Sequence, residues 1–200
     1  MNDYLRGCGL ALVLGGGLLI FINVIITPSY LASFKQGEAV ARASGIYLLR
    51  ISLALVDVSL LLFGSTGLYL NHKAASGTFG TAAFLATFLG TSLLLAIEWS
   101  NLFVLRPVAQ TSPEALGLLD KSSLMTAGSA SGAGIFMLGW LLLAMSLWRA
   151  NLSPQWAAPA TIAGIILIPI LGVTPLGVIG QVIGNVVFGL GLIGFGYSLL

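Results

Sequence analysis

The sequence contains very few charged residues. Charged side chains make up 7% of its 200 residues, whereas 58% of the residues are hydrophobic. A typical soluble domain is about 25% charged, so this chain cannot cover itself with a water-facing surface. We therefore predict an integral membrane protein surrounded by membrane lipids. The net charge of +2 and the dispersed basic residues exclude nucleic acid as a partner.

Cysteine, histidine and lysine are also scarce. The single cysteine, Cys8, excludes an internal disulfide, a CxxC redox pair and a Cys-rich metal site. The single histidine, His72, cannot supply the paired axial ligands of a membrane haem. The lysines all fall in connections between apolar stretches, which excludes a buried retinal Schiff base: Lys35, Lys73 and Lys121. We expect no cofactor and no metal, and we favour a non-catalytic protein.

Long apolar runs dominate what is present. About 20 apolar residues are needed for a helix to cross a bilayer, and six stretches meet that length approximately. They are residues 8–27, 45–69, 79–104, 123–147, 156–172 and 175–198. We predict a single all-α domain over residues 1–200, a polytopic bundle of six transmembrane helices with both termini on one side. The basic residues divide too evenly between the two sides to predict the orientation.

Small residues recur within these stretches. Gly128 and Gly132 are four residues apart, as are Gly180 and Gly184. Because lipid supplies no hydrophobic drive for helices to associate, such small residues allow close helix packing. They can also form a contact face for another subunit or a ligand, and we favour packing within one bundle.

Three ionisable residues, Arg50, Asp57 and Glu98, fall inside the predicted spans. Charged groups at such depths are costly and face the bundle interior. Arg50 and Asp57 are two helical turns apart and share a face. If the second and third spans turn near residue 75, Arg50 and Glu98 lie at nearly the same depth. We therefore predict an Arg50–Glu98 ion pair, with Asp57 deeper and opposite the hydroxyl groups within residues 90–92.

Other polar side chains are placed to join this cluster. We predict that Trp99 and Asn101 flank its mouth, and that Asn23 and either Gln181 or Asn185 reach it. The cluster has two interpretations, a structural ion pair that sets the helix register or a site for a ligand, an ion or a proton. We interpret the Arg50–Glu98 pair as structural. Asp57 lacks a basic partner and is the better candidate for binding, and no residue is predicted to be catalytic.

Two segments resemble a known family. ARASGIYLLRISLALVDVSLLLFGSTGLYL (41–70) and LGWLLLAMSLWRANLSPQWAAPATIAGIIL (138–167) are similar to parts of the DUF4386 family, six-span bacterial membrane proteins of unknown function. Glu98 stands where that family carries an Arg-Leu-Glu signature, although the arginine is missing here. The turn Ser153-Pro154-Gln155-Trp156 replaces a Pro-Arg-Trp-like turn. The resemblance implies a six-helix bundle in a bacterial cytoplasmic membrane, and it implies no activity.

Three classes of function follow from these patterns. The first is a non-catalytic membrane protein, either an accessory subunit of a membrane complex or a binder of a lipid or another hydrophobic small molecule. The alternative is a small secondary transporter or proton-coupled carrier that uses Asp57 and Glu98. An intramembrane enzyme is the weakest hypothesis. The expected partners are membrane lipids, other membrane subunits or further copies of the chain.

Overall fold

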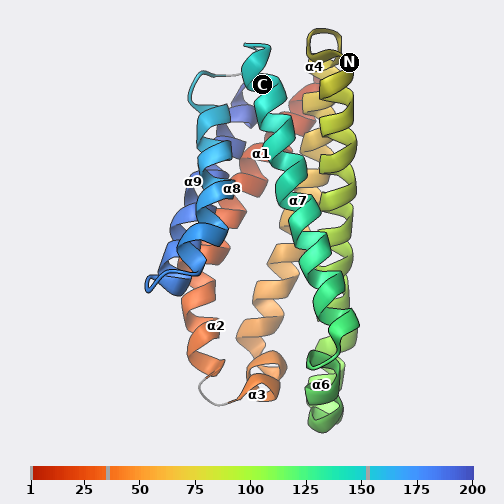
Figure 1. Cartoon of the computed structure of the whole chain (residues 1–200), viewed down its shortest axis with the longest axis vertical. Coiled ribbons are helices and arrows are strands. Elements are labelled where there is room, and N and C mark those ends of the chain that lie inside the picture. The colour runs from red at the N-terminus through yellow and green to blue at the C-terminus, as the bar shows by residue number, and fades with distance from the viewer. Residues whose placement is uncertain (1, 35–36, 152–153) are drawn as a thin grey trace.

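The computed structural model describes residues 2–34, 37–151 and 154–200, and every regular element in those residues is helical. The predicted all-α class is therefore confirmed (Figure 1). The elements are α1 (Asn2–Phe21), η1 (Ile22–Ile26), α2 (Thr27–Phe34), α3 (Glu38–Ala43), α4 (Gly45–Ser100), η2 (Asn101–Leu105), α5 (Arg106–Thr111), α6 (Pro113–Asp120), α7 (Ser123–Arg149), α8 (Ala157–Gly172) and α9 (Gly177–Tyr197). The two η segments are π-helical turns.

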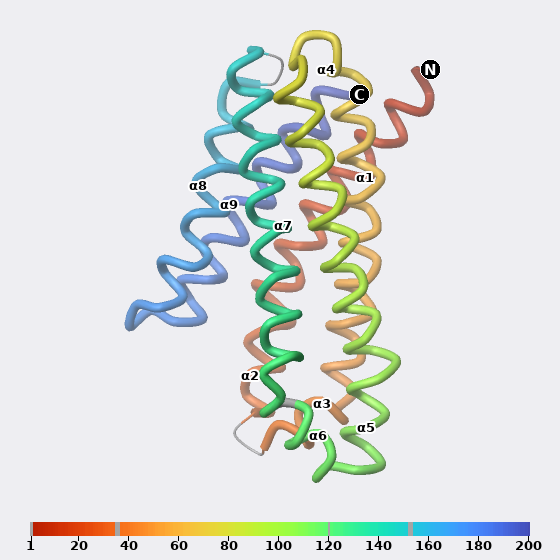
Figure 2. The backbone as a smooth tube through the Cα atoms, turned by 45° about the vertical axis from the view of Figure 1, so that its right-hand side comes forward, coloured from red at the N-terminus to blue at the C-terminus, as the bar shows by residue number. Residues whose placement is uncertain are grey.

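Helix α4 is folded into two antiparallel arms. Its 56 residues are interrupted at Gly77, where φ is 59° and ψ is −153°. A positive φ costs glycine nothing but strains residues that carry a Cβ, so the chain reverses at this residue. Figure 2 shows the two arms running side by side below the turn. The reversal lies two residues beyond the predicted position, and this shift changes which side chains face one another.

The long helices pack in a closed order around one core. The first arm of α4 packs on α1, the second arm packs on α7, and α8 and α9 pack on each other, on α7 and on α1. The core contains the fully buried side chains of Trp140, Phe188 and Phe195. Both chain ends and the Gly77 turn lie at one end of the bundle, as expected for an even number of crossings (Figure 1).

Glycines allow the close helix contacts that the sequence predicts. A Cβ on Gly184 would lie 2.7 Å from the backbone nitrogen of Ile168, and one on Gly132 would lie 2.7 Å from Cδ1 of Ile97. By contrast, a Cβ on Gly128 would meet no atom within 4 Å. Packing within the bundle therefore accounts for Gly132 and Gly184, but not for Gly128.

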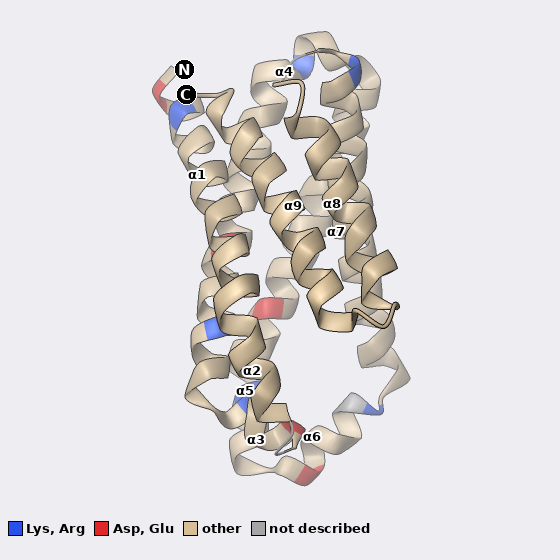
Figure 3. Cartoon of the chain, turned by 90° about the vertical axis from the view of Figure 1, so that its left-hand side faces the viewer, with Lys and Arg blue, Asp and Glu red and all other residues tan. Residues whose placement is uncertain are grey.

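Within the described residues, four helical stretches are long and apolar enough to cross a membrane. They are Asn2–Phe34, Gly45–Thr111, Ser123–Arg149 and Gly177–Tyr197. Large apolar side chains cover the outside of these helices, among them Leu14, Phe63 and Leu85. Charged residues gather at the two ends of the bundle, and few lie between (Figure 3). Soluble monomers rarely expose such an apolar surface, so the molecule is compatible with an α-helical membrane protein.

Two predicted helix ends are wrong. The first helix does not stop before Pro28 but continues to Phe34, and the third does not stop before Pro107 but continues to Thr111. A proline removes one backbone hydrogen bond and collides with the preceding turn of an α-helix. In both places a five-residue π-helical turn comes just before the proline and widens the helix, which lets it continue.

The fifth helix agrees with the predicted stretch 156–172 to within one residue and is short for a bilayer crossing. Helix α8 begins at Ala157 and has 16 residues. Ser153, the first residue of the expected turn, lies outside the described residues. The α8–α9 hairpin ends well short of the end of the bundle that α2 and α6 reach (Figures 1 and 3). This hairpin end is where the polar residues of the candidate site meet α9.

Candidate functional site

Polar side chains from distant parts of the sequence converge on one cavity. Its volume is about 250 Å³, and its walls come from α1, η1, α2, both arms of α4, α7 and α9. We call it the polar cavity, and its polar lining residues are Asn23, Thr27, Arg50, Asp57, Glu98, Gln181 and Asn185. The structure thus places the three ionisable residues of the predicted spans around one cavity, and both candidate side chains of α9 reach it.

Asp57 is the most deeply buried polar group of the cavity. It is 3% exposed, and its Oδ1 has no hydrogen-bond partner among the described residues. Gly15 of α1 lies against this arm, since a Cβ on Gly15 would lie 2.9 Å from Cδ2 of Leu61 and 3.4 Å from Oδ1 of Asp57. A buried carboxylate without a partner is unfavourable in an apolar interior. Asp57 is therefore the side chain whose position protein contacts alone do not explain.

The turn at Gly77 places Glu98, not the expected hydroxyl groups, at the depth of Asp57. Asp57 lies 20 residues before Gly77 and Glu98 lies 21 after it, so the two arms bring them to nearly the same level. The hydroxyl of Thr91 is used elsewhere, because it accepts a hydrogen bond of 3.2 Å from Nε1 of Trp140 on α7. The prediction that residues 90–92 face Asp57 is therefore wrong for Thr91.

The predicted ion pair between Arg50 and Glu98 is also wrong. The one ion pair within 4.0 Å in the described residues joins Arg42 and Glu38. Relative to Gly77, Arg50 and Glu98 differ in depth by six residues, or about 9 Å at 1.5 Å per residue. Instead, the Arg50 guanidinium lies 5.4 Å from the ring centroid of Tyr30, a cation–π contact. Arg50 Nε is buried without a hydrogen-bond partner among the described residues.

The two residues predicted at the mouth of the cluster have different positions. Asn101 supports the site, because its Nδ2 donates a hydrogen bond of 3.3 Å to Oε2 of Glu98. Trp99 does not line the polar cavity: it is 53% exposed and packs against Phe103 on the outside. One residue along a helix turns a side chain by roughly 100°, so Trp99 cannot share the direction of Glu98.

The π-helical turns place the two predicted asparagines at the site; the sequence analysis named both residues but missed the turns that position them. Asn23 lies in η1 and lines the polar cavity, while Asn101 begins η2 and holds Glu98. Both turns stand at the same spacing before their prolines, Pro28 and Pro107. Such turns are frequent at functional sites. The sequence feature that could have indicated these turns is a proline shortly after an asparagine within an otherwise unbroken apolar run.

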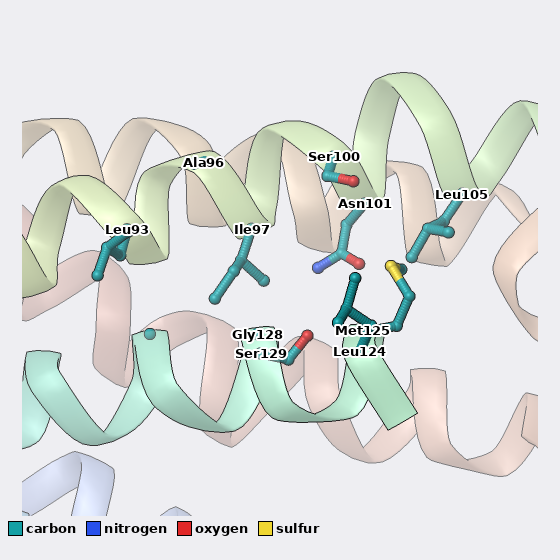
Figure 4. A pocket seen from close by; sticks show the side chains of 11 residues that line it. Leu93, Ala96, Ile97, Ser100, Asn101, Leu105, Leu124, Met125, Gly128 and Ser129 are labelled. Carbon is teal, nitrogen blue, oxygen red and sulfur yellow. The ribbon is translucent and has the colours of Figure 1, made fainter. Parts of the chain in front are cut away.

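A second hollow lies on the other side of the second arm of α4. It has a volume of about 270 Å³ and separates the end of this arm and η2 from the start of α7 (Figure 4). Leu105 lies beside Met125, Leu93 and Ile97 point toward α7 further along, and the Asn101 side chain also points toward α7. Apart from Asn101 and two serines its lining is apolar, and Gly128 leaves it open.

The described residues contain no group of three or more His, Cys, Asp or Glu side chains that could hold a metal ion. The fold and the polar cavity define an all-helical protein with membrane-length apolar helices and a buried acidic site. Comparison of the chain with protein-family models, with curated proteins and with solved structures finds no match. The resemblance to the DUF4386 family therefore stays a prediction.

Proposed function

We propose that this protein crosses the membrane six times and binds a small hydrophobic or amphiphilic molecule in the polar cavity. The six crossings are α1 with its continuation, the two arms of α4, α7, α8 and α9. Each arm of α4 exceeds the length of about 20 residues that a bilayer requires. Helix α8 is shorter, and local thinning of the bilayer can accommodate it. The family resemblance adds a bacterial cytoplasmic membrane to the proposal.

The observation that carries the binding proposal is the composition of the cavity wall. Apolar side chains, including Leu19, Phe136 and Phe188, surround a few polar groups in a volume of about 250 Å³. Ligand sites are typically concave and mostly apolar, with a small number of placed polar groups. Gln181 is exposed and also lines the cavity. It marks a rim at the end of the α8–α9 hairpin from which a molecule can enter.

The test is retention of bound molecules by protein purified in a mild detergent. Ala54 is buried and lines the polar cavity, so Ala54→Phe places a ring inside it. We expect native mass spectrometry to detect a bound small molecule on the unmodified chain and to lose it in Ala54→Phe. The matched control is Ala82→Phe, which adds the same ring at an exposed position of α4. Equal retention by all three proteins would contradict the proposal.

A second candidate function is a proton-coupled carrier. The observation that favours it is the placement of two carboxyl groups, Asp57 and Glu98, at one depth of one cavity. A carrier moves its substrate across sealed vesicles when a proton gradient is applied, whereas a binder only retains it. Uptake that depends on the gradient and disappears in Asp57→Asn would favour the carrier over the binder.

A further inference from the structure

The charges that line the polar cavity do not balance. Asp57 and Glu98 are acidic, and Arg50 is the one basic residue of the lining. Arg50 sits two helical turns from Asp57 along the same arm and places its guanidinium over Tyr30. Glu98 accepts a hydrogen bond from Asn101, whereas Asp57 has no ion-pair partner among the described residues. One positive charge is therefore missing near Asp57.

Apart from Arg50 on its own arm, the described lining of the cavity supplies no cation near Asp57. Helix α1 presents Gly15 at the carboxyl group, and α9 contributes the neutral side chains of Gln181 and Asn185. The α7 wall is the ring of Phe136, and the second arm of α4 adds a further acid, Glu98. Burying a carboxylate without a compensating charge is strongly unfavourable. A positively charged group from outside the chain would remove this cost.

The wall of the cavity favours an organic cation over a bare metal ion. A metal cation of the Ca²⁺ type needs about six or more oxygen ligands at short distances, whereas most of this wall is hydrocarbon. Phe136 and Phe188 stand edge to face, with ring centroids 6.0 Å apart. Their rings offer an apolar surface and, through their faces, a cation–π contact to an ammonium group.

We propose that the ligand of the polar cavity is a small amphiphile with a single positive charge on nitrogen. This inference rests on the proposed binding function and adds the chemical class of the ligand. The ammonium group lies at the carboxylate of Asp57, with Glu98 contributing to the negative potential. The apolar body packs against Phe136 and Phe188. The amide groups of Asn23 and Gln181 accept any further hydrogen bonds of the ligand.

The experiment compares three water-soluble probes of similar size that differ in charge. They are protonated N,N-dimethylbenzylamine, N,N-dimethylbenzamide and phenylmethanesulfonate, titrated into the full chain in lipid nanodiscs by calorimetry. A charge-assisted contact contributes about 1.5–3 kcal/mol. We therefore expect the cation to bind about ten- to a hundredfold more tightly than the neutral amide, and the anion to bind more weakly than either.

Variants test whether Asp57 causes the preference for the cation over the neutral amide. Asp57→Asn is expected to bind the cation and the neutral amide equally, while Asp57→Glu keeps the preference. Glu98→Gln reduces the preference in part and provides a second variant if Asp57→Asn folds poorly. The matched control is Glu114→Gln, which removes an exposed acid at the end of the bundle and leaves all affinities unchanged.

The outcomes separate this inference from the proposed function. If the cation and the neutral amide bind equally, the inference that the ligand is positively charged is overturned. If Ala54→Phe also abolishes the binding of both, the cavity is still a binding site. Failure of the cation to bind also overturns the inference. The binding function falls as well only if Ala54→Phe and the unmodified chain retain the same molecules after purification.

Discussion

At the scale of single residues, Asp57 and Arg50 show which features helical spacing predicts and which it does not. Their spacing correctly predicts that both face the same interior space, and both line the polar cavity. Their partners do not follow from the spacing. Arg50 contacts the ring of Tyr30, a residue of α2 that the sequence analysis assigned to a connection. Each of the two residues carries a buried polar atom without a hydrogen-bond partner in the described part of the chain.

The lack of partners at Asp57 predicts the effect of its replacement on stability. We expect Asp57→Asn to leave the thermal unfolding midpoint in detergent unchanged or higher, because Oδ1 loses no hydrogen bond and a buried charge is removed. The comparison is Thr91→Val, which leaves the buried Nε1–H of Trp140 without its acceptor and costs about 1–3 kcal/mol. A larger loss in Asp57→Asn than in Thr91→Val would show that Asp57 has a structural role.

At the scale of elements, the close seam between the second arm of α4 and α7 depends on glycine. A Cβ on Gly90 would lie 2.5 Å from the backbone nitrogen and Cα of Phe136. Backbone atoms cannot turn aside as a flexible side chain can. A methyl group at this position therefore forces the arm and α7 apart, and with them one wall of the polar cavity, since Phe136 lines it.

We expect Gly90→Ala to reduce the free energy of unfolding by about 1–3 kcal/mol through overpacking. The matched control is Gly134→Ala on α7, where a Cβ would meet no atom within 4 Å. Alanine is the better helix former by up to about 1 kcal/mol, so the control is neutral or stabilising. Chemical or thermal unfolding of the two variants in the same detergent measures the difference. Similar unfolding of both would show that the seam is looser than described.

The π-helical turns are the second feature at this scale. Each carries a helix past a proline and places an asparagine at the polar cavity or on its Glu98. In η1 the hydroxyl of Thr27 donates a hydrogen bond of 3.1 Å to the carbonyl of Ile22. The same carbonyl also accepts the backbone N–H of Thr27, so both donors of the residue directly before Pro28 bind one carbonyl of the π-helical turn. The prolines and the asparagines thus belong to one local arrangement, and the prolines do not end the helices.

At the scale of the whole molecule, the ends of the bundle differ from its middle in charge. Lys73 and Arg149 lie toward the end that carries both termini, whereas Glu114 and Lys121 lie at the opposite end. Charged groups at both ends with an apolar surface between them suit a protein that sits across a bilayer. The proposed six crossings place these two pairs of residues on opposite sides.

Labelling of single cysteines tests this arrangement. In a Cys8→Ala background we expect Lys73→Cys and Arg149→Cys to react with a membrane-impermeant maleimide from one side of sealed vesicles. Glu114→Cys and Lys121→Cys are expected to react only from the other side. All four positions are exposed. Cys8 itself is buried, so the unmodified chain provides an unlabelled control. Reaction of residues 73 and 114 from the same side would exclude the six-span arrangement.

The sequence by itself determines the all-helical fold, the apolar surface and most members of the polar cluster, although Trp99 lies outside it. These features follow from hydrophobicity and the 3.6-residue helical period, which are properties of short segments. The tertiary structure alone decides which groups meet. The reversal at Gly77 sets the register of the two arms, so that Asp57 lies level with Glu98 and Arg50 turns to Tyr30. The physical reason is that moving the turn by two residues changes the residue opposite any given position on the other arm by four, about one helical turn. The pattern of residues within a single helix does not predict where the turn falls.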